Sequence, residues 1–432
     1  MILEYYLERF SSSIPLIKEK TIKDIDIIVS IPVYNEDIGN LERLLNSLIK
    51  AYKKEFKIEL IFLVNEPEDE KEEVKEKHKL IIKFLNKKKK ELEEENFKIH
   101  PLYVNNIPRK KFGIGNARKI SCDEAIRRYE FIKKEKGILA TLDADCTVKE
   151  NYFDEVIKTF SDYETEFAHI YFEHPLHDIE DEKLKTGIIY YELFLRFYKN
   201  SLIFADYPYV SYTIGSCLAI RADTYARFGG FKAKRKAGED FYFVQKILPH
   251  IKFTEIIDTT VYPQARISER VPFGTGKALK DFIEGKEKFY YSLPFEPFRE
   301  LKELKFFVKG DKNIDELPDL LKAYLLREKI KKRIQIIRNK TKHFKNFVKD
   351  FYLWFNLLKA FRFIRFYINK TQKRTILEES VKELIKEIEK NGEIQKEVST
   401  YNLLLYLRKY DKKNFFKNVN LFNEFYKKWM RD

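Results

Sequence analysis

The feature that most constrains the fold is a regular alternation of short apolar runs with longer amphipathic stretches along residues 25–142. Four short apolar runs are typical of buried strands: 25–31, 58–64, 98–104 and 137–142. Three stretches between them have apolar residues at helical spacing: 37–54, 68–95 and 117–134. Strands that alternate with helices form mostly parallel sheets covered by helices on both faces. We therefore predict an open α/β sheet in this part of the chain.

The composition is that of a folded protein. Hydrophobic residues make up 44% of the 432 residues, which is enough for a sizeable core in two or three domains. The three cysteines, Cys122, Cys146 and Cys217, include no CxxC pair, so we expect neither a disulfide framework nor a cysteine-ligated zinc. The N-terminus lacks a cleavable apolar segment and we find no membrane-spanning window. We therefore expect a cytoplasmic protein.

The excess positive charge lies in the last third of the chain. Residues 301–432 contain 33 Lys or Arg against 17 Asp or Glu, although the whole chain has a net charge of only +15. This region has little Gly or Pro and no strand pattern, so we expect it to be helical. We divide the chain into a domain at 1–300 and a basic helical region at 301–432. The basic charge either covers a solvated face or attracts an anionic partner.

Polar residues follow the predicted strands at the points where the strands end. Pro32-Val33-Tyr34-Asn35-Glu36 follows the first strand, Asn65-Glu66-Pro67 the second and Asp143-Ala144-Asp145 the fourth, while Arg118 follows the third. In open α/β sheets, ligands bind beyond the carboxyl ends of the strands. We therefore expect these residues to converge on one cleft.

The Asp143-Ala144-Asp145 segment is the strongest candidate for a metal site. Two carboxylates that close a buried strand are costly unless they are hydrogen-bonded or bind a cation. Carboxylate oxygens suit Mg²⁺ or Mn²⁺, and a diphosphate can complete the coordination shell. The same pattern also caps ordinary turns, so the metal site is a prediction that depends on this position after a strand.

A second acidic pair, Glu239-Asp240, precedes the apolar stretch 241–248 and follows Gly229-Gly230-Phe231. A carboxylate at the start of a helix can be a structural cap. It can also act as a general base that takes a proton from a hydroxyl, while the first acidic pair binds metal. We predict the second role for Asp240.

Together these motifs resemble the family 2 glycosyltransferases, which have the GT-A fold. Residues 32–36 look like the P-x-Y-N-E motif of that family, 113–119 resemble its G-x-x-x-A-R-N segment with Lys119 in place of Asn, and 143–145 match its D-x-D motif. Gly229-Gly230-Phe231 with Glu239-Asp240 resembles the G-G-F…E-D pair. The resemblance covers about residues 24–260. It implies an inverting, metal-dependent transferase that uses a nucleotide-diphosphate sugar, with a UDP-sugar favoured, and an acceptor hydroxyl.

The resemblance also implies roles for single residues. Glu36 would contact the nucleoside, Arg118 the nucleotide or its phosphates, and Asp145 the metal, with Asp143 at the ribose or a metal-bound water. Asp240 would deprotonate the acceptor, with Glu239 beside it. The positions that the resemblance assigns to donor binding are Pro32, Tyr34, Glu36, Asn65, Arg118, Asp143, Ala144 and Asp145.

Two departures from the family pattern affect these expectations. Asn65-Glu66-Pro67 stands where the family usually has an Asp-rich turn, which leaves the choice of base open, although the Asn65 amide could bond a base. The Q-x-x-R-W motif of processive members is absent, since Ile267 and Ser268 follow Gln264 at the Arg and Trp positions. This absence weighs against a polysaccharide synthase.

The segment 263–277 is a candidate loop for closing over the donor diphosphate or for holding an anionic acceptor. It contains Arg266, Arg270 and Lys277 together with two glycines, and such groups bind phosphates readily. The alternative is an ordinary surface loop with turn glycines. We assign Arg266 and Arg270 to donor binding.

The histidines and the C-terminal aromatic residues permit more than one interpretation. His169, His174 and His177 are more consistent with structural histidines than with zinc ligands, because Pro175 interrupts their spacing. In the basic region, six apolar residues recur at helical spacing: Phe344, Phe347, Phe351, Phe355, Leu358 and Phe361. This face either packs on the transferase domain, which we prefer, or contacts an anionic membrane surface. Nucleic acid is an unlikely partner because we find no nucleic-acid module.

We therefore predict a GT-A-type glycosyltransferase that uses Mn²⁺ or Mg²⁺, located in the cytoplasm or at the inner face of the membrane. The main alternative is a catalytically inactive, transferase-like binding protein. A nucleotidyltransferase and a basic scaffold are further alternatives. Against a nucleotidyltransferase, the sequence lacks a Gly-rich, Lys-containing nucleotide loop near its N-terminus.

Overall fold

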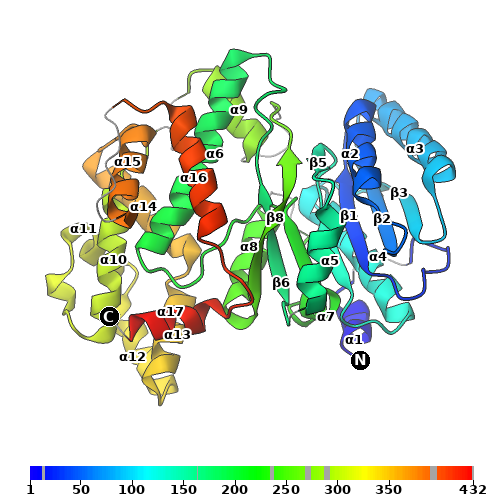
Figure 1. The fold of residues 1–432 in the computed structure, drawn as a ribbon. Helices are drawn as coiled ribbons and strands as arrows, with labels where there is room; N and C mark the ends of the chain where they lie inside the picture. Colours follow the sequence, from blue (N-terminus) through cyan, green and yellow to red (C-terminus); the bar gives the residue numbers. More distant parts are fainter. Residues whose placement is uncertain are drawn as a thin grey trace.

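One curled sheet and two layers of helices form the N-terminal part of the protein (Figure 1). The computed structural model describes residues 1–11, 15–162, 164–233, 238–267, 274–286, 292–389 and 397–430. The sheet order is β3-β2-β1-β4-β7-β6-β8-β5. The strands are β1 (Ile27–Val33), β2 (Ile58–Pro67), β3 (Phe97–Ile107), β4 (Ile138–Thr141), β5 (Cys146–Val148), β6 (Phe167–Phe172), β7 (Leu218–Arg221) and β8 (Phe253–Pro263).

The pairing of the strands brings their carboxyl ends to one edge of the sheet. Strands β1, β2, β3 and β4 pair in parallel, β6 pairs in parallel with β8, and β7 runs antiparallel between β4 and β6. Strand β5 is antiparallel to β8. The predicted open, mostly parallel sheet is therefore confirmed, and the segments after β1, β4, β6 and β8 all lie at the same edge.

Helices cover both faces, because the strands alternate their side chains between two cores. Ile27, Val29 and Ile31 of β1 pack in one core with helices α2 (Ile38–Ala51), α3 (Glu72–Leu92) and α5 (Tyr152–Asp162). Ile28 points into the other core. That core contains residues of α1 (Ile2–Arg9), α4 (Ile114–Phe131), α6 (Glu182–Phe204), α7 (Ala222–Arg227) and α8 (Glu239–Ile247). A central strand buried on both faces explains why its sequence is apolar throughout.

The second core continues without a break into the C-terminal helices. These helices are α9 (Thr275–Ile283), α10 (Glu296–Lys309), α11 (Asp319–Arg327), α12 (Ile330–Lys340), α13 (Phe344–Trp354), α14 (Leu357–Thr371), α15 (Leu377–Glu389), α16 (Thr400–Lys413) and α17 (Leu421–Trp429). Short 3₁₀ turns occur at Leu248–His250 and Ile314–Glu316. Helices α9, α10, α15 and α16 pack against α6. Helix α10 spans the predicted boundary at residue 300, and the division into 1–300 and 301–432 stays a prediction.

Buried ion pairs fasten α16 to α6. The Arg196 guanidinium donates to the Asp411 carboxylate at 2.5 Å and to Glu192 at 2.8 Å, and all three side chains are buried. Tyr212 also donates to Asp411, at 2.7 Å. Burial pushes the pKa of Glu192 upward, but Arg196, His174 and Arg408 together hold that pKa well below its ordinary value. Arg196 and Glu192 both belong to α6, whereas Asp411 belongs to α16 and keeps its buried cation partner only while α16 stays docked.

Three details differ from the sequence predictions. Strand β1 continues through Pro32 to Val33, and β2 continues to Pro67, so Asn65 lies within a strand instead of after it. The aromatic stripe at 344–361 does not form one helical face, because the chain breaks between α13 and α14, where Asn356 caps α14 by accepting from the Lys359 amide. Phe347, Phe351 and Phe355 are buried as predicted for packing. In the described part of the chain, no helix is both long and apolar enough to cross a membrane.

Candidate active site

Arg118 joins the two acidic motifs that the sequence separates by nearly a hundred residues. Its Nη2 donates to Asp143 Oδ1 at 2.5 Å, and its Nη1 donates to Glu239 Oε1. Both Arg118 and Glu239 are almost fully buried, whereas the side chain of Asp143 is 39% exposed. Burial disfavours the charge on Arg118, but Asp143, Glu239 and Asp240 raise its pKa above its ordinary value. The Asp-x-Asp turn and the Glu-Asp pair therefore form one cluster.

A glycine makes room for this guanidinium. Gly215 precedes β7, and its carbonyl accepts a hydrogen bond from Thr141 Oγ1 at 2.6 Å. A Cβ placed on Gly215 would lie 2.5 Å from Nη1 of Arg118 and 2.7 Å from its Cζ. No larger residue fits at position 215 without displacing Arg118 from its carboxylates.

A second arginine, Arg266, bonds two further carboxylates of the cluster, those of Asp145 and Glu36. It follows β8, and its Nε donates to Asp145 Oδ2 at 2.6 Å. Its two Nη groups donate to the carboxylate of Glu36 at 2.9 and 2.7 Å. Glu36 is buried and also accepts from the Asn40 amide at 2.6 Å. The end of β1, the Asp-x-Asp turn and the segment after β8 therefore meet, as the positions of the strand ends predict.

Both carboxylates of the Asp-x-Asp turn lie outside the core beneath α2 and α5. Ala144 is buried with Leu142 and Cys146 in the core beneath α2 and α5, whereas Asp143 and Asp145 are only half-buried. Burial raises the pKa of Asp145, with Asp143 and Glu36 adding to this effect and Arg266 opposing it. Like charges gathered at a partly buried site favour a cation.

Asp143 and Asp145 supply some, but not all, of the ligands that a hard divalent cation needs. Asp143 and Asp145 supply carboxylate oxygens, which suit Mg²⁺ or Mn²⁺. Among the described residues, however, no group of three or more His, Cys, Asp or Glu side chains could hold a metal. An ion here would need water or substrate phosphates as its remaining ligands, which is how Mg²⁺ is commonly held.

Asp240 has the titration behaviour of a base that works near neutral pH. It lies in the first turn of α8, where its Oδ1 accepts from the Phe241 amide at 2.7 Å, and its side chain is half-buried. Burial raises the pKa of Asp240 to about 7, and repulsion from Glu239 contributes to this rise. Its neighbour Glu239 is the residue that bonds Arg118, so the two carboxylates of the pair have different environments.

The segment after β1 is held by α3, which the sequence analysis left without a function. Asn35 has a left-handed backbone (φ 47°), and its amide donates to His78 Nε2 at 3.0 Å. Because Nε2 accepts, the proton of a neutral His78 lies on Nδ1, which bonds Glu66 Oε2 at 3.0 Å. The Tyr34 hydroxyl donates to Glu70 at 2.7 Å. The turn that carries Glu36 is thus fixed by His78 of α3 and by Glu70, which lies between β2 and α3.

Two of the residues assigned to donor binding lie in the strands themselves. Pro32 is buried in β1 opposite Leu63. Asn65 is buried at the end of β2, and its Nδ2 has no hydrogen-bond partner among the described residues. An unpaired buried amide donor is costly, so Asn65 is suited to a ligand that brings an acceptor.

Other sequence-predicted groups lie outside this cluster or outside the described residues. Arg270 lies outside the described residues, so its prediction stands as it was made. Lys277 of the same segment pairs with Asp281 in α9 at 2.8 Å. His174 Nδ1 bonds Glu192 at 2.9 Å, His169 is buried with its pKa well below the ordinary value because of burial, and His177 is exposed. These positions agree with the structural interpretation of the histidines.

Sequence reasoning missed the pairing of Arg118 with Glu239 and the roles of Gly215 and His78. Nothing in the sequence around Gly215 distinguishes it from other glycines, and only the approach of Arg118 to this position makes a glycine necessary. His78 is one of several polar residues in a highly charged helix, and no local pattern distinguishes it from its neighbours.

Comparison with known proteins identifies this part of the chain. Residues 28–228 match the family model described as glycosyl transferase family 2. This segment is a family 2 glycosyltransferase domain. The matched range contains Glu36, Asn65, Arg118 and the Asp-x-Asp turn, and it ends just before the Glu239-Asp240 pair. The predicted resemblance to the family 2 glycosyltransferases is therefore confirmed.

Solved structures similar to this glycosyltransferase are distant from it. S. aureus TarS residues 1–349 in complex with UDP-GlcNAc is 13% identical and has a TM-score of 0.38, with 67% of this chain and 77% of that chain covered. A second structure of TarS 1–349, with no ligand named, is 14% identical and has a TM-score of 0.36. The match covers 94% of this chain and 92% of that chain. GalNAc-T7 with UDP, GalNAc and Mn²⁺ is 16% identical over 74% of this chain and 58% of its own, with a TM-score of 0.35. No curated protein sequence matches the chain significantly.

Proposed function

We propose that this glycosyltransferase moves a sugar from a nucleotide-diphosphate donor to an acceptor hydroxyl in a single inverting step that requires Mg²⁺ or Mn²⁺. The observation that carries the proposal is the position of Arg118, which bonds both Asp143 and Glu239. It brings a candidate metal-binding turn and a candidate base into one cluster within a family 2 domain.

Asp240 is the base in this scheme. Its carboxylate accepts the proton of the acceptor hydroxyl, the acceptor oxygen forms a bond to the anomeric carbon, and the bond from that carbon to the diphosphate oxygen breaks. The leaving nucleoside diphosphate keeps the electron pair. A pKa of about 7 supports this role, because a base is most effective when its pKa lies near the working pH.

Glu239 and Arg118 act as positioning residues. Glu239 is buried and bonded to Arg118, and its repulsion adds to the effect of burial in raising the pKa of its neighbour Asp240. Arg118 in turn fixes the partly exposed side chain of Asp143. The contact of Arg118 with the donor phosphates, as predicted from the sequence, remains part of the proposal.

Donor binding rests on the residues at the ends of β1, β2 and β8. The unpaired Asn65 amide is suited to an acceptor atom on the nucleobase, which supports its assigned role although it does not select uracil. Glu36 is assigned to the nucleoside. Pro32, Tyr34 and Ala144 shape the backbone around these groups, and a UDP-sugar is the favoured donor.

Asp143 and Asp145 would hold the metal, which offsets negative charge on the departing diphosphate when it is bound. Arg266 already bonds Asp145 and Glu36. We propose that a cation at Asp145 competes with this guanidinium, and that Arg266 then serves the donor diphosphate together with Arg270.

The test is donor binding and hydrolysis across a panel of nucleotide-diphosphate sugars, with and without Mn²⁺. We expect one nucleotide to bind in a metal-dependent way, and we expect Asp145→Ala to abolish that binding. Asp240→Asn should keep donor binding and lose transfer. Asp258→Asn, an exposed carboxylate of β8, is the matched control. If the folded protein bound no donor at any metal concentration, the inactive binding-protein alternative would replace this proposal.

A further inference from the structure

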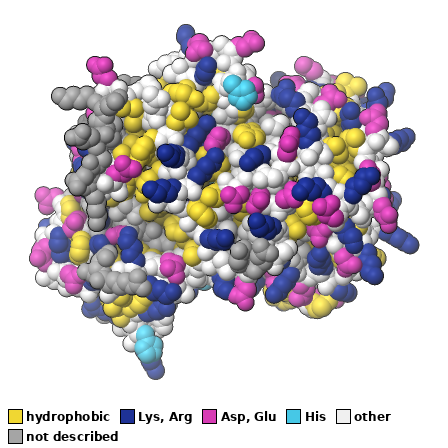
Figure 2. All heavy atoms as spheres, in the orientation of Figure 1, with side chains coloured by type: hydrophobic (Ala, Val, Ile, Leu, Met, Phe, Trp, Pro, Cys, Tyr) yellow, Lys and Arg dark blue, Asp and Glu magenta, His cyan; other side chains and the backbone are white. Residues whose placement is uncertain are grey.

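A basic surface with an exposed aromatic ring lies at the corner between α12 and α13, which we call the corner surface. Its cations are Arg338, Lys340, Lys342 and Lys345, and all four side chains are exposed. None of the four makes an ion pair with a carboxylate that the structure describes. At the lower end of the face in Figure 2, where Figure 1 places α12, Lys and Arg side chains lie beside hydrophobic ones.

Phe344 stands among these cations. It is 40% exposed, and its ring stacks on Trp429 with 6.2 Å between centroids and 9° between planes. Met430, the next residue after Trp429, is 57% exposed. Single exposed apolar residues are ordinary, but an aromatic ring fixed within a group of unpaired cations is the pattern of segments that lie in a membrane interface.

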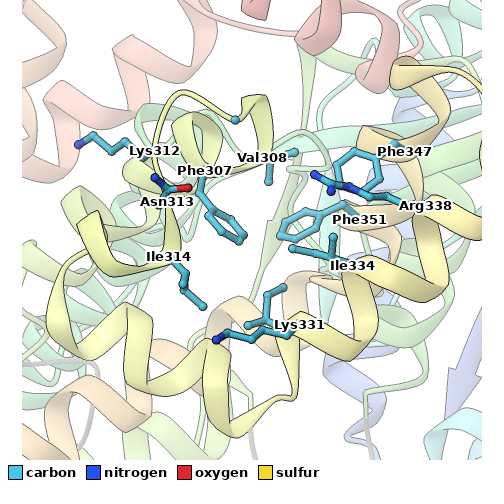
Figure 3. A pocket seen from close by; sticks show the side chains of 12 residues that line it. Phe307, Val308, Lys312, Asn313, Ile314, Lys331, Ile334, Arg338, Phe347 and Phe351 are labelled. Atoms are coloured by element: carbon cyan, nitrogen blue, oxygen red, sulfur yellow. The ribbon is translucent and has the colours of Figure 1, made fainter.

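A pocket of about 300 Å³, lined by both apolar and basic side chains, opens beside the corner surface. Figure 3 shows Phe307, Val308 and Ile334 facing the cavity together with Phe347 and Phe351 of α13. The charged residues that line it are Lys312, Lys331 and Arg338, and no acidic residue lines it. The pocket therefore combines an apolar interior with a cationic margin.

Arg338 connects the pocket to the surface. It lines the pocket, and its guanidinium lies 5.7 Å from the centre of the Phe347 ring. Lys331, one helical repeat of seven residues earlier on α12, lines the same pocket, is exposed and has no carboxylate partner among the described residues. An anion bound between these two cations would have its apolar part directed at the pocket.

We propose that the corner surface docks on a bilayer that contains anionic phospholipids. The cations bind the headgroups, Phe344 enters the interface, and the pocket receives part of an acyl chain. Each Lys or Arg near an anionic surface strengthens such binding. Nucleic acid fits less well, because the pocket wall is mostly aliphatic and aromatic and Asn313 is the one lining side chain with an amide to read a base edge.

This inference does not depend on the proposed function. Figure 1 shows α12 and α13 at the other end of the molecule from β1, β2 and β3. A protein that transferred no sugar could still bind the bilayer, and an active transferase could fail to bind it. The two proposals are therefore tested by separate measurements.

The experiment is flotation of the full-length protein with vesicles of phosphatidylcholine alone or of equal parts phosphatidylcholine and phosphatidylglycerol. The test variant reverses three charges: Lys340→Glu, Lys342→Glu and Lys345→Glu. The matched control reverses three exposed lysines of α3 and has the same net charge: Lys83→Glu, Lys87→Glu and Lys90→Glu. Phe344→Ser tests the aromatic ring, and circular dichroism and thermal unfolding establish that each variant folds.

We expect binding to the anionic vesicles only. The corner variant should weaken it by at least about tenfold, Phe344→Ser should weaken it severalfold, and the α3 control should leave it nearly unchanged. Equal binding to neutral vesicles, no binding to anionic ones, or equal losses in the corner and control variants would overturn the proposal. Binding of a single-stranded RNA, but not of vesicles, through the same lysines would also overturn it and would assign the surface to nucleic acid.

Discussion

Gly215 and Arg118 fit together so closely that a single methyl group at residue 215 would collide with the guanidinium, at 2.5 Å from Nη1. The contact matters because Arg118 is the residue that bonds Asp143 and Glu239. A residue in the segment before β7 thereby controls the geometry of side chains from α4, α8 and the Asp-x-Asp turn.

Gly215→Ala should damage the candidate site more than the fold. The new Cβ would push Arg118 from one or both carboxylates, and a buried charge that loses a partner costs about 3 kcal/mol. We expect transfer to fall by at least about tenfold and the midpoint of urea unfolding to decrease. Gly39→Ala in α2 is the control, since a Cβ there meets nothing within 4 Å and a helical Gly→Ala change is usually stabilising. Full activity in Gly215→Ala would show that the position of Arg118 is unimportant.

The pH dependence of transfer should report the titration of Asp240. The base must be deprotonated, so kcat/KM should rise with pH and level off above a pKa of about 7. Asp240→Asn should remove most of the activity across the whole range. Glu239→Gln should move the inflection to lower pH, because it removes the negative charge that raises the pKa of Asp240. An inflection that Glu239→Gln leaves in place would assign the titration to another group.

Arg266→Ala should tighten the binding of Mn²⁺ by the donor-free protein. The Arg266 guanidinium neutralises Asp145 and Glu36, and without it these carboxylates attract a cation more strongly. We expect about a tenfold decrease in Kd at pH 8, measured from the electron paramagnetic resonance signal of free Mn²⁺. The KM for the donor should rise in the same variant. Arg9→Ala, which removes an exposed arginine of α1, should change neither value, and an unchanged Kd in Arg266→Ala would exclude the competition.

Asp411→Asn should loosen the C-terminal helices from the transferase domain. The change leaves Arg196 and Lys199 buried with less opposing charge, at a cost of about 3 kcal/mol in the free energy of unfolding. Asp311→Asn, at an exposed position, is the control for urea unfolding. If Asp411→Asn lowered the free energy of unfolding no more than Asp311→Asn does, the pairing of Asp411 with Arg196 and Lys199 would contribute little to stability.

The same network should make the protein sensitive to acid. Burial raises the pKa of Asp411, but Lys199 and Arg196 outweigh this effect and hold the pKa below its ordinary value. A carboxyl group of this kind stabilises the fold above its unfolded pKa of about 3.9, and that contribution is lost as the pH falls. We expect the wild type to lose more stability than Asp411→Asn between about pH 5 and pH 2.

Much of the sheet was predictable from the sequence because its signals are local. The apolar run of β1 and the alternation with α2, β2 and α4 predict a parallel sheet, and the ends of the strands predict where Glu36 and Asp145 meet. The boundaries were less accurate, since Pro32 and Asn65 lie in strands that continue past the apolar runs. Pairing with neighbouring strands, which a single segment cannot reveal, determines where a strand ends.

The sequence by itself determined the residue types and their order: an Asp-x-Asp turn after a buried strand, a Glu-Asp pair at a helix start and a basic helical region at the C-terminus. Only the tertiary structure decided which charges neutralise one another. Arg118 of α4 pairs with Glu239 of α8 and Arg196 of α6 pairs with Asp411 of α16, because burial leaves each cation with only the carboxylates that packing brings to it. The cations of the corner surface received no such partner among the described residues. The same residue types therefore serve a candidate active site, an anchor for α16 and a surface suited to anionic lipid.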